Sequence, residues 1–278
     1  MMSVIRSLIS HRLALTGSVV TMLVLLAITV GPIVSPYAPT EMDFADLLSP
    51  PSLMHPFGTD SFGRDVLTRV LYGARVSLAV SSIGVLIAMI VGTAGGMLAA
   101  YSGGIIDIAI MQLSDLLFSF PSFVLALFLM FVFGYGVVNI SIAISLIYLP
   151  IFARLARNLA MLILNEPWLQ AARLFGQSTT SVIAREILPN IMAPLLVQAT
   201  IGVAFGIIIE AGLSFIGLGV QPPNPSLGSI MADGREYFGL APWVITLTGA
   251  WISIALLGLN LLGDGLRDLT DPKMRSRM

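Results

Sequence analysis

The chain contains 278 residues, of which 56% are hydrophobic and only 10% are charged. Soluble domains carry about 25% charged residues, so this composition excludes an ordinary water-soluble domain and indicates an integral membrane protein. A formal net charge of −1 gives no sign of a nucleic-acid partner. With no cysteine and two histidines, the chain has neither a disulfide scaffold nor the ligands for a thiolate or His-rich metal site.

Long apolar runs define the organisation of the chain. A helix needs about 20 apolar residues to cross the bilayer core, and on that criterion we expect about six spans and an all-α fold. The runs are residues 13–34, 76–101, 105–132, 137–152, 191–220 and 242–262. The first is too long for a cleaved signal peptide, which indicates an uncleaved anchor helix.

Prolines and glycines within these runs predict local geometry. Pro121 and Pro150 are expected to kink the third and fourth spans. The Gly-x-x-x-Gly pairs at 92–96 and 202–206 predict close crossings with neighbouring helices in the second and fifth spans.

The distribution of basic residues predicts the orientation. If the N-terminus is cytoplasmic, ten of the 14 basic residues lie inside: Arg6, Arg12, Arg154, Arg157, Arg173, Arg185, Arg267, Lys273, Arg275 and Arg277. The other four lie outside: Arg64, Arg69, Arg75 and Arg235. Because cytoplasmic loops are enriched in Lys and Arg, both termini are predicted to be cytoplasmic.

The outside stretch 60–75 carries acid-to-base pairs at i,i+4 spacing, Asp60–Arg64 and Asp65–Arg69, beside an apolar face. This pattern predicts a short amphipathic helix at the outer interface, which either caps the bundle or contacts an external protein. We therefore divide the chain into residues 1–75, an anchor helix with an extracytoplasmic amphipathic segment, and residues 76–278, a core domain that includes the cytoplasmic segment 153–190.

That cytoplasmic segment predicts two short helices around a glycine. Asn165 followed by Glu166-Pro167 is typical of a helix start, and residues 168–175 follow as a helix that Gly176 can end. The hydroxyls of residues 178–180 can cap a second helix over 181–188, and Pro189 and Pro194 mark the return to the membrane. Small Ala171 and Ala172 suit docking into a groove of a partner protein, and packing on the chain's own bundle is the alternative.

Two sets of residues carry a family resemblance. Gln170-Ala171-Ala172, then Gly176, then Leu188-Pro189 resembles the EAA motif of ABC-importer permeases, with Gln170 in place of the usual glutamate and Glu186 in place of isoleucine. The segments at 55–60 (HPFGTD), 63–78, 210–223 and 260–268 resemble the second, C-type permease subunit of dipeptide, oligopeptide and nickel importers. This resemblance covers nearly the whole chain after the first span.

The resemblance implies a type I ABC-importer permease bundle in the inner membrane of a prokaryote. Its implied partners are a second, homologous permease, two ATP-binding subunits that hold ATP and magnesium, and an extracytoplasmic substrate-binding protein. The implied coupling residues, which would meet the ATPases, are Glu166, Pro167, Trp168, Leu169, Gln170, Ala171, Ala172, Arg173, Phe175, Gly176, Leu188 and Pro189.

Three further features are candidates for transport itself. Asp115 and Glu210 lie within spans, where ionisable groups are costly, so they either line the translocation path or pair with neighbouring helices. Asp107 lies near the inner end of its span and is expected to be structural. The stiff segment of Gln221, Pro222, Pro223 and Asn224 is either a docking platform for the binding protein or a rigid turn.

The motifs favour a transport subunit without catalytic activity or cofactor of its own. The only lysine, Lys273, lies outside any P-loop sequence, so nucleotide binding by that motif is excluded. Zinc-protease and serine-hydrolase motifs are also missing. We expect ATP-driven import by alternating access, with di- or oligopeptides favoured over nickel, metal chelates, glutathione or opines. A proton-coupled carrier that uses Asp115 and Glu210 is the more distant alternative.

Overall fold

The computed structural model describes residues 12–174 and 177–270, and every regular element in these ranges is helical. The elements are α2 (Arg12–Val34), α3 (Val66–Ser102), α4 (Gly104–Phe118), α5 (Ser122–Phe133), α6 (Val137–Leu164), α7 (Pro167–Leu174), α8 (Thr179–Ser181), the π-helix η1 (Val182–Ile187), α9 (Leu188–Phe215), α10 (Leu227–Arg235) and α11 (Pro242–Thr270).

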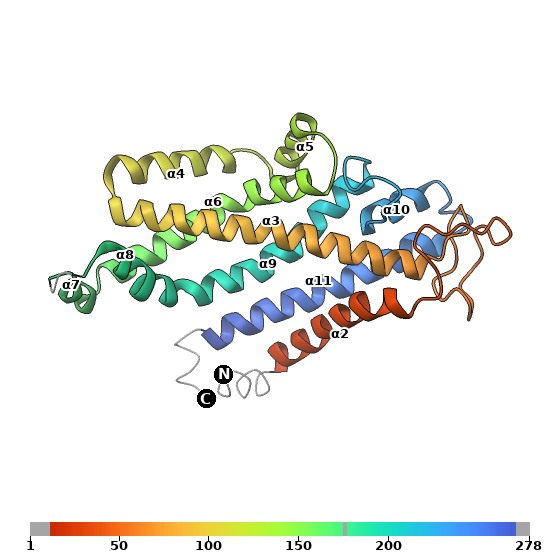
Figure 1. Ribbon diagram of the computed structural model, residues 1–278, viewed down its shortest axis with the longest axis horizontal. Coiled ribbons are helices and arrows are strands. Elements are labelled where there is room, and N and C mark those ends of the chain that lie inside the picture. The colour runs from red at the N-terminus through yellow and green to blue at the C-terminus, as the bar shows by residue number, and fades with distance from the viewer. Residues whose placement is uncertain (1–11, 175–176, 271–278) are drawn as a thin grey trace.

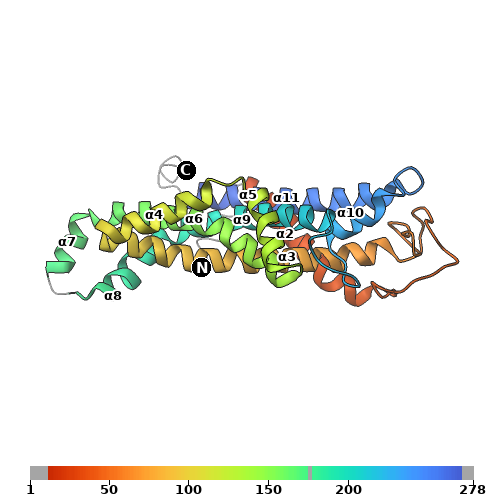
Figure 2. The ribbon, with the colours of Figure 1, turned by 90° about the horizontal axis from the view of Figure 1, so that it is seen from above.

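Five helical stretches are long and apolar enough to cross a membrane, and the pair α4–α5, bent by 93°, makes six if it is counted as one span. This confirms the predicted all-α membrane fold. The helices form an elongated bundle, with α7 and α8 at one end and the α2–α3 connection with α10 at the other (Figures 1 and 2).

Close backbone contacts hold the bundle together. The most extensive helix pair is α3 with α6, and a Cβ added at Gly96 would lie only 2.1 Å from the Ala153 carbonyl oxygen. A Cβ at Gly206 would lie 3.0 Å from the Cβ of Ser81. The close crossings predicted from the Gly-x-x-x-Gly pairs are therefore confirmed.

A second tight seam, which the sequence did not predict, joins α2 to α11. A Cβ at Gly17 would lie 2.3 Å from the Leu262 backbone nitrogen, and one at Gly265 would lie 2.4 Å from the Cα of Ala14. The anchor helix is thus held against the last span through backbone contacts.

The prediction of a separate amphipathic helix over residues 60–75 is wrong. Residues 60–65 are non-helical, and α3 begins at Val66 and runs unbroken for 37 residues. Asp65 caps this helix, since its side chain accepts hydrogen bonds from the Thr68 backbone nitrogen and hydroxyl, both at 2.7 Å. Arg75, directly before the start of the predicted second span, donates to the Ile28 carbonyl of α2 at 3.1 Å.

Other boundaries also differ from the prediction. The fourth span continues through Pro150 to Leu164, so the first third of the predicted cytoplasmic segment is the end of α6. The third span breaks at Pro121 into α4 and α5 instead of kinking. The outer segment after α9 contains a helix that was not predicted, α10, which a capping box of Ser226 and Ser229 begins.

Candidate coupling and docking sites

The predicted coupling segment forms a helical hairpin that projects at one end of the bundle (Figure 1). Its first helix, α7, begins at Pro167 as predicted. Trp168 is 46% exposed, whereas Leu169 is fully buried. Glu166, Pro167 and Gln170 are exposed. One side of α7 is therefore anchored by Leu169, and the other is free to meet a partner.

The hairpin's ends are fixed by local hydrogen bonds, only some of which were predicted. Asn165 ends α6, with its side-chain nitrogen donating to the Met161 carbonyl at 2.9 Å, so its predicted role as the cap of α7 is wrong. Ser178 does cap the returning arm, since its hydroxyl accepts from the Ser181 nitrogen at 3.4 Å. The Tyr101 hydroxyl lies 2.8 Å from that of Thr179 and ties the arm to α3.

The second predicted short helix is not a separate element. α8 leads through the π-helix η1 directly into α9, with Pro189 in the first turn of α9. Proline lacks a backbone N–H, and the first turn of a helix is where that N–H is not needed. One continuous helical stretch, Val182–Phe215, therefore connects the hairpin to the opposite end of the bundle (Figure 1).

Buried apolar residues attach the hairpin to the membrane core. Leu169, Val182 and Ile187 belong to the main hydrophobic cluster of the bundle, while Leu188 is half-buried and Pro189 is exposed. The predicted residues Phe175 and Gly176 lie outside the described residues, and for Ala171, Ala172 and Arg173 only the helical backbone is described.

At the opposite end, a network of charges organises the connection between α2 and α3. Arg64 Nε donates to Asp60 Oδ2 at 2.6 Å, which confirms that predicted pair. The predicted pair of Asp65 with Arg69 does not form, because Arg69 Nε instead lies 3.4 Å from Asp60 Oδ2. Both arginines reach Asp233, within α10, at 3.0 and 3.2 Å.

The same connection is tied to the bundle by further hydrogen bonds. His55 Nδ1 lies 2.9 Å from the cap residue Asp65, and the indole nitrogen of Trp243 donates to the Thr59 carbonyl at 3.2 Å. Periodicity could not reveal these contacts, since they join residues up to 184 positions apart. In the sequence, the HPFGTD motif at 55–60 contains two of the residues that make these contacts, His55 and Thr59.

The candidate docking segment is exposed and firmly held. Gln221, Pro222, Pro223 and Asn224 are all exposed, and the Gln221 side chain donates to the Gly219 carbonyl at 3.1 Å. Hydrogen bonds to the end of α9 hold the residue before this segment. The Val220 nitrogen donates to the Ser214 hydroxyl, which in turn donates to Glu210 Oε1 at 2.6 Å.

Glu210 is fully buried where α3, α9 and α10 meet. The hydroxyls of Ser77 and Ser226 face its carboxyl group, and Oε2 has no hydrogen-bond partner within standard distance. In this conformation Glu210 is thus a buried residue that helps to join the three helices. A role in lining the translocation path stays a prediction.

The aspartates of α4 pair with arginines of α6. Asp107 binds Arg157 through both carboxylate oxygens, as expected for a structural residue. Asp115 forms an ion pair with Arg154, whose guanidinium also lies 4.5 Å from the Phe118 ring centroid. The side chains of Asp115 and Arg154 remain 61% and 42% exposed, so pairing does not remove them from a surface, and path lining by Asp115 stays a prediction.

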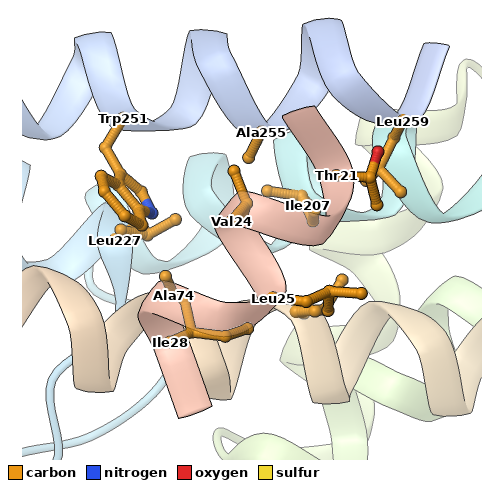
Figure 3. A pocket seen from close by; sticks show the side chains of 11 residues that line it. Thr21, Val24, Leu25, Ile28, Ala74, Ile207, Leu227, Trp251, Ala255 and Leu259 are labelled. Carbon is orange, nitrogen blue, oxygen red and sulfur yellow. The ribbon is translucent and has the colours of Figure 1, made fainter. Parts of the chain in front are cut away.

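A small cavity lies between α2 and the core, lined almost wholly by apolar side chains such as Val24, Ile28 and Ile207 (Figure 3). Its volume is about 30 Å³, far below the several hundred Å³ of a small-molecule site. We interpret it as a packing gap behind the anchor helix.

A bundle of five or six apolar helices, with a helical hairpin exposed at one end and a rigid charged segment at the other, defines a membrane permease subunit. The chain belongs to the family described as the binding-protein-dependent transport system inner membrane component, which matches residues 84–276. Residues 1–51 match the N-terminal transmembrane domain of oligopeptide transport permease C. The chain is thus a C-type permease of an ABC importer, a multi-pass protein of the bacterial inner membrane.

Curated relatives match along almost their whole length. The chain is 39% identical to the dipeptide transport system permease protein DppC of Alkalihalophilus pseudofirmus, covering 98% of this chain and 89% of the relative. It is 39% identical to the di/tripeptide transport system permease protein DppC of Pseudomonas aeruginosa, covering 98% and 91%. It is 38% identical to the glutathione transport system permease protein GsiD of Escherichia coli, covering 95% and 88%.

Among solved structures, the fold is similar to the MetNI methionine ABC transporter in an inward-facing conformation. The TM-score is 0.57 at 20% sequence identity, covering 73% of this chain and 96% of the MetNI chain. This similarity supports the fold assignment.

Proposed function

We propose that this chain is the C-type permease subunit of an ATP-driven, binding-protein-dependent importer of di- and oligopeptides. The observation that carries the proposal is the hairpin around α7, exposed at one end of a bundle whose relatives include dipeptide and di/tripeptide permeases. The chain itself is not an enzyme; ATP and magnesium bind to partner subunits.

The proposed complex contains a second, homologous permease, two ATP-binding subunits and an extracytoplasmic binding protein. The ATPases contact the α7 hairpin on the cytoplasmic side, and the binding protein docks near residues 221–224. Both chain termini face the cytoplasm in this arrangement. Residues 1–75 serve as anchor and outer segment, and residues 76–278 serve as the transport core.

The geometry of α9 supports alternating access. A helix of 28 residues is about 42 Å long, and α9 runs from the hairpin to the Glu210 junction beneath the candidate docking segment. Because a helix transmits axial displacement with little compression, closure of the ATPases can shift the outer end through α9. Nucleotide then biases an equilibrium between inward- and outward-open states.

Reconstitution of the complete importer into proteoliposomes tests the proposal. We expect uptake of labelled dipeptides that requires ATP and loaded binding protein and is blocked by vanadate. Uptake that persists without ATPase subunits, or that collapses with the proton gradient alone, would contradict it. Import of glutathione, an opine or a nickel chelate instead of dipeptides would retain the permease assignment and replace the cargo.

The coupling role of α7 has its own test. We expect Ala172→Trp to insert normally and to leave basal ATP hydrolysis intact while uptake falls more than about tenfold, since a bulky ring blocks close approach of the partner. Ala45→Trp, on the exposed outer loop, is the matched control and should retain uptake. Equal uptake by both variants would argue against docking at this surface.

A further inference from the structure

A cavity opens between α3 and α9 in the half of the bundle nearest the hairpin, where these helices lie side by side (Figure 1). Its volume is about 280 Å³. Three methionines, one threonine and several aliphatic residues line it, including Met89, Thr93, Met97, Leu188, Met192 and Leu195. The residues from α9 lie in its first two turns, directly after η1.

The lining is apolar and adaptable. Methionine is unbranched and polarizable, so it fills irregular space and accommodates ligands of different shape. Flexible Met-rich surfaces are typical of proteins that bind many related partners. A cavity of this size lies just below the range of small-molecule sites, and it fits one amino-acid side chain better than a whole peptide.

One polar atom in the cavity lacks a partner. Thr93 is 5% exposed, and its hydroxyl forms no hydrogen bond. Other hydroxyls in the bundle donate to the carbonyl four residues earlier, as Ser81 of α3 does to Ser77 at 2.8 Å and Thr248 of α11 does to Val244 at 2.6 Å. A buried hydroxyl without a partner is costly. The Thr21 hydroxyl beside the 30 Å³ gap also lacks a partner, but only the cavity at Thr93 has room for a ligand that supplies one.

This unpaired hydroxyl distinguishes the possible occupants. A lipid acyl chain has no group that could pair with it, and a transmembrane helix of a partner satisfies its own backbone internally. A short peptide carries both an apolar side chain and free amide or terminal groups. We propose that this cavity binds an apolar side chain of the transported peptide, with the Thr93 hydroxyl hydrogen-bonded to the peptide backbone.

The inference rests on the proposed function of peptide import, and it assigns to this chain a part in recognising the transported peptide. Because the hydroxyl meets the backbone, its contribution is shared by all peptides. Because the methionines meet the side chain, their contribution depends on the side chain's size. Substitutions of Thr93 and of a residue in the cavity lining can therefore separate the two contributions.

The reconstituted importer tests this separation with two substrates, Leu-Leu and Gly-Gly. We expect Ala94→Phe, which places a ring in the cavity lining, to reduce Leu-Leu uptake about tenfold and Gly-Gly uptake less than twofold. Thr93→Val, which keeps the shape and removes the hydroxyl, should reduce both about equally. Val91→Phe, at an exposed position of α3 outside the cavity lining, is the control and should change neither.

A photoreactive dipeptide that contains p-benzoylphenylalanine gives a direct readout that does not depend on transport. We expect crosslinks to Met89, Met97 or Met192 in the purified complex, lost on competition with Leu-Leu and unaffected by oleate. Crosslinks removed by oleate only, or none at these residues, would overturn the inference. If the importer carries no peptide but the crosslinks persist, the proposed cargo fails while the cavity assignment stands.

Discussion

The two ends of this molecule are built in different ways. At the end that we propose to be outside the cell, called here the outer end, Asp60 and Arg69 have side chains only 4% exposed and belong to one charge network with Arg64 and Asp233. At the opposite, inner end, the hairpin is attached by a few buried apolar side chains and a small number of hydrogen bonds. The Asp115–Arg154 pair on the α4–α6 surface is 61% and 42% exposed.

The difference indicates different mechanical roles. Segments with many buried contacts open only at high free-energy cost, whereas segments with few contacts open more readily. The outer end is therefore a fixed platform, and the inner hairpin is the part suited to move with a partner. α9 connects them through η1, and π-helical turns are frequent at functional sites.

The largest expected effect comes from breaking the outer network. Asp60→Asn removes the shared carboxylate between Arg64 and Arg69 and leaves two nearly buried guanidinium groups with Asp233 as their remaining carboxylate partner. Loss of one partner from a buried ion pair costs about 3–5 kcal/mol. We expect a large drop in the thermal unfolding midpoint of the detergent-solubilised protein.

Glu41→Gln is the control, because Glu41 lies on the same outer loop and is exposed. It should change the unfolding midpoint little. If the two variants were equally stable, the outer end would not be the fixed platform described above.

A smaller effect is expected where α3 crosses α6. Gly96→Ala places a methyl group 2.1 Å from the Ala153 carbonyl oxygen, so the helices must separate. Overpacking of this kind costs about 1–3 kcal/mol. Gly95→Ala, whose Cβ meets nothing within 4 Å, should instead gain up to about 1 kcal/mol from helix propensity. Opposite shifts in the unfolding midpoint are the expected result, and similar shifts would contradict the close crossing.

A substitution in the inner hairpin should destabilise only the hairpin. Ser178→Ala removes the cap of α8, and loss of a capping hydroxyl costs about 1 kcal/mol. Because the hairpin has few other ties, we expect faster hydrogen exchange in α8 and η1, with α10 unchanged. Faster exchange across the whole bundle would mean that the hairpin is not an independent unit.

The sequence predicted the features that depend on local pattern. Apolar length identified the spans, and Pro167 located the start of the first arm of the hairpin. The hydroxyls of residues 178–180 included the cap of the second arm, which begins two residues before the predicted start. The Gly-x-x-x-Gly pairs predicted the α3 crossings, because close approach needs small residues at helical spacing. Composition and motifs together also identified the family.

The missing features depend on tertiary contacts. Asp65–Arg69 has the spacing of a helical pair, but Asp65 is used as a cap and Arg69 reaches across to Asp60 and Asp233. The unbroken helix from Val66 was not predicted, because the charges of residues 60–75 indicated an amphipathic helix separate from the apolar run 76–101. In the structure Arg75 is satisfied by carbonyls of α2, 47 positions away, a partner that no local pattern could reveal.

The smallest effect on stability is expected from the exposed ion pair, and it sharpens the contrast with Asp60. Asp115→Asn removes the same kind of charge from the same kind of pair, but in a setting where such pairs contribute less than about 1 kcal/mol. The unfolding midpoint should therefore hardly change. An exposed carboxylate within a span still requires a polar surrounding, and if that surrounding is the translocation path, uptake of a cationic dipeptide such as Lys-Ala should fall more than that of Ala-Ala. Equal uptake of both, at unchanged stability, would place Asp115 outside the path and leave the pair a surface contact between α4 and α6.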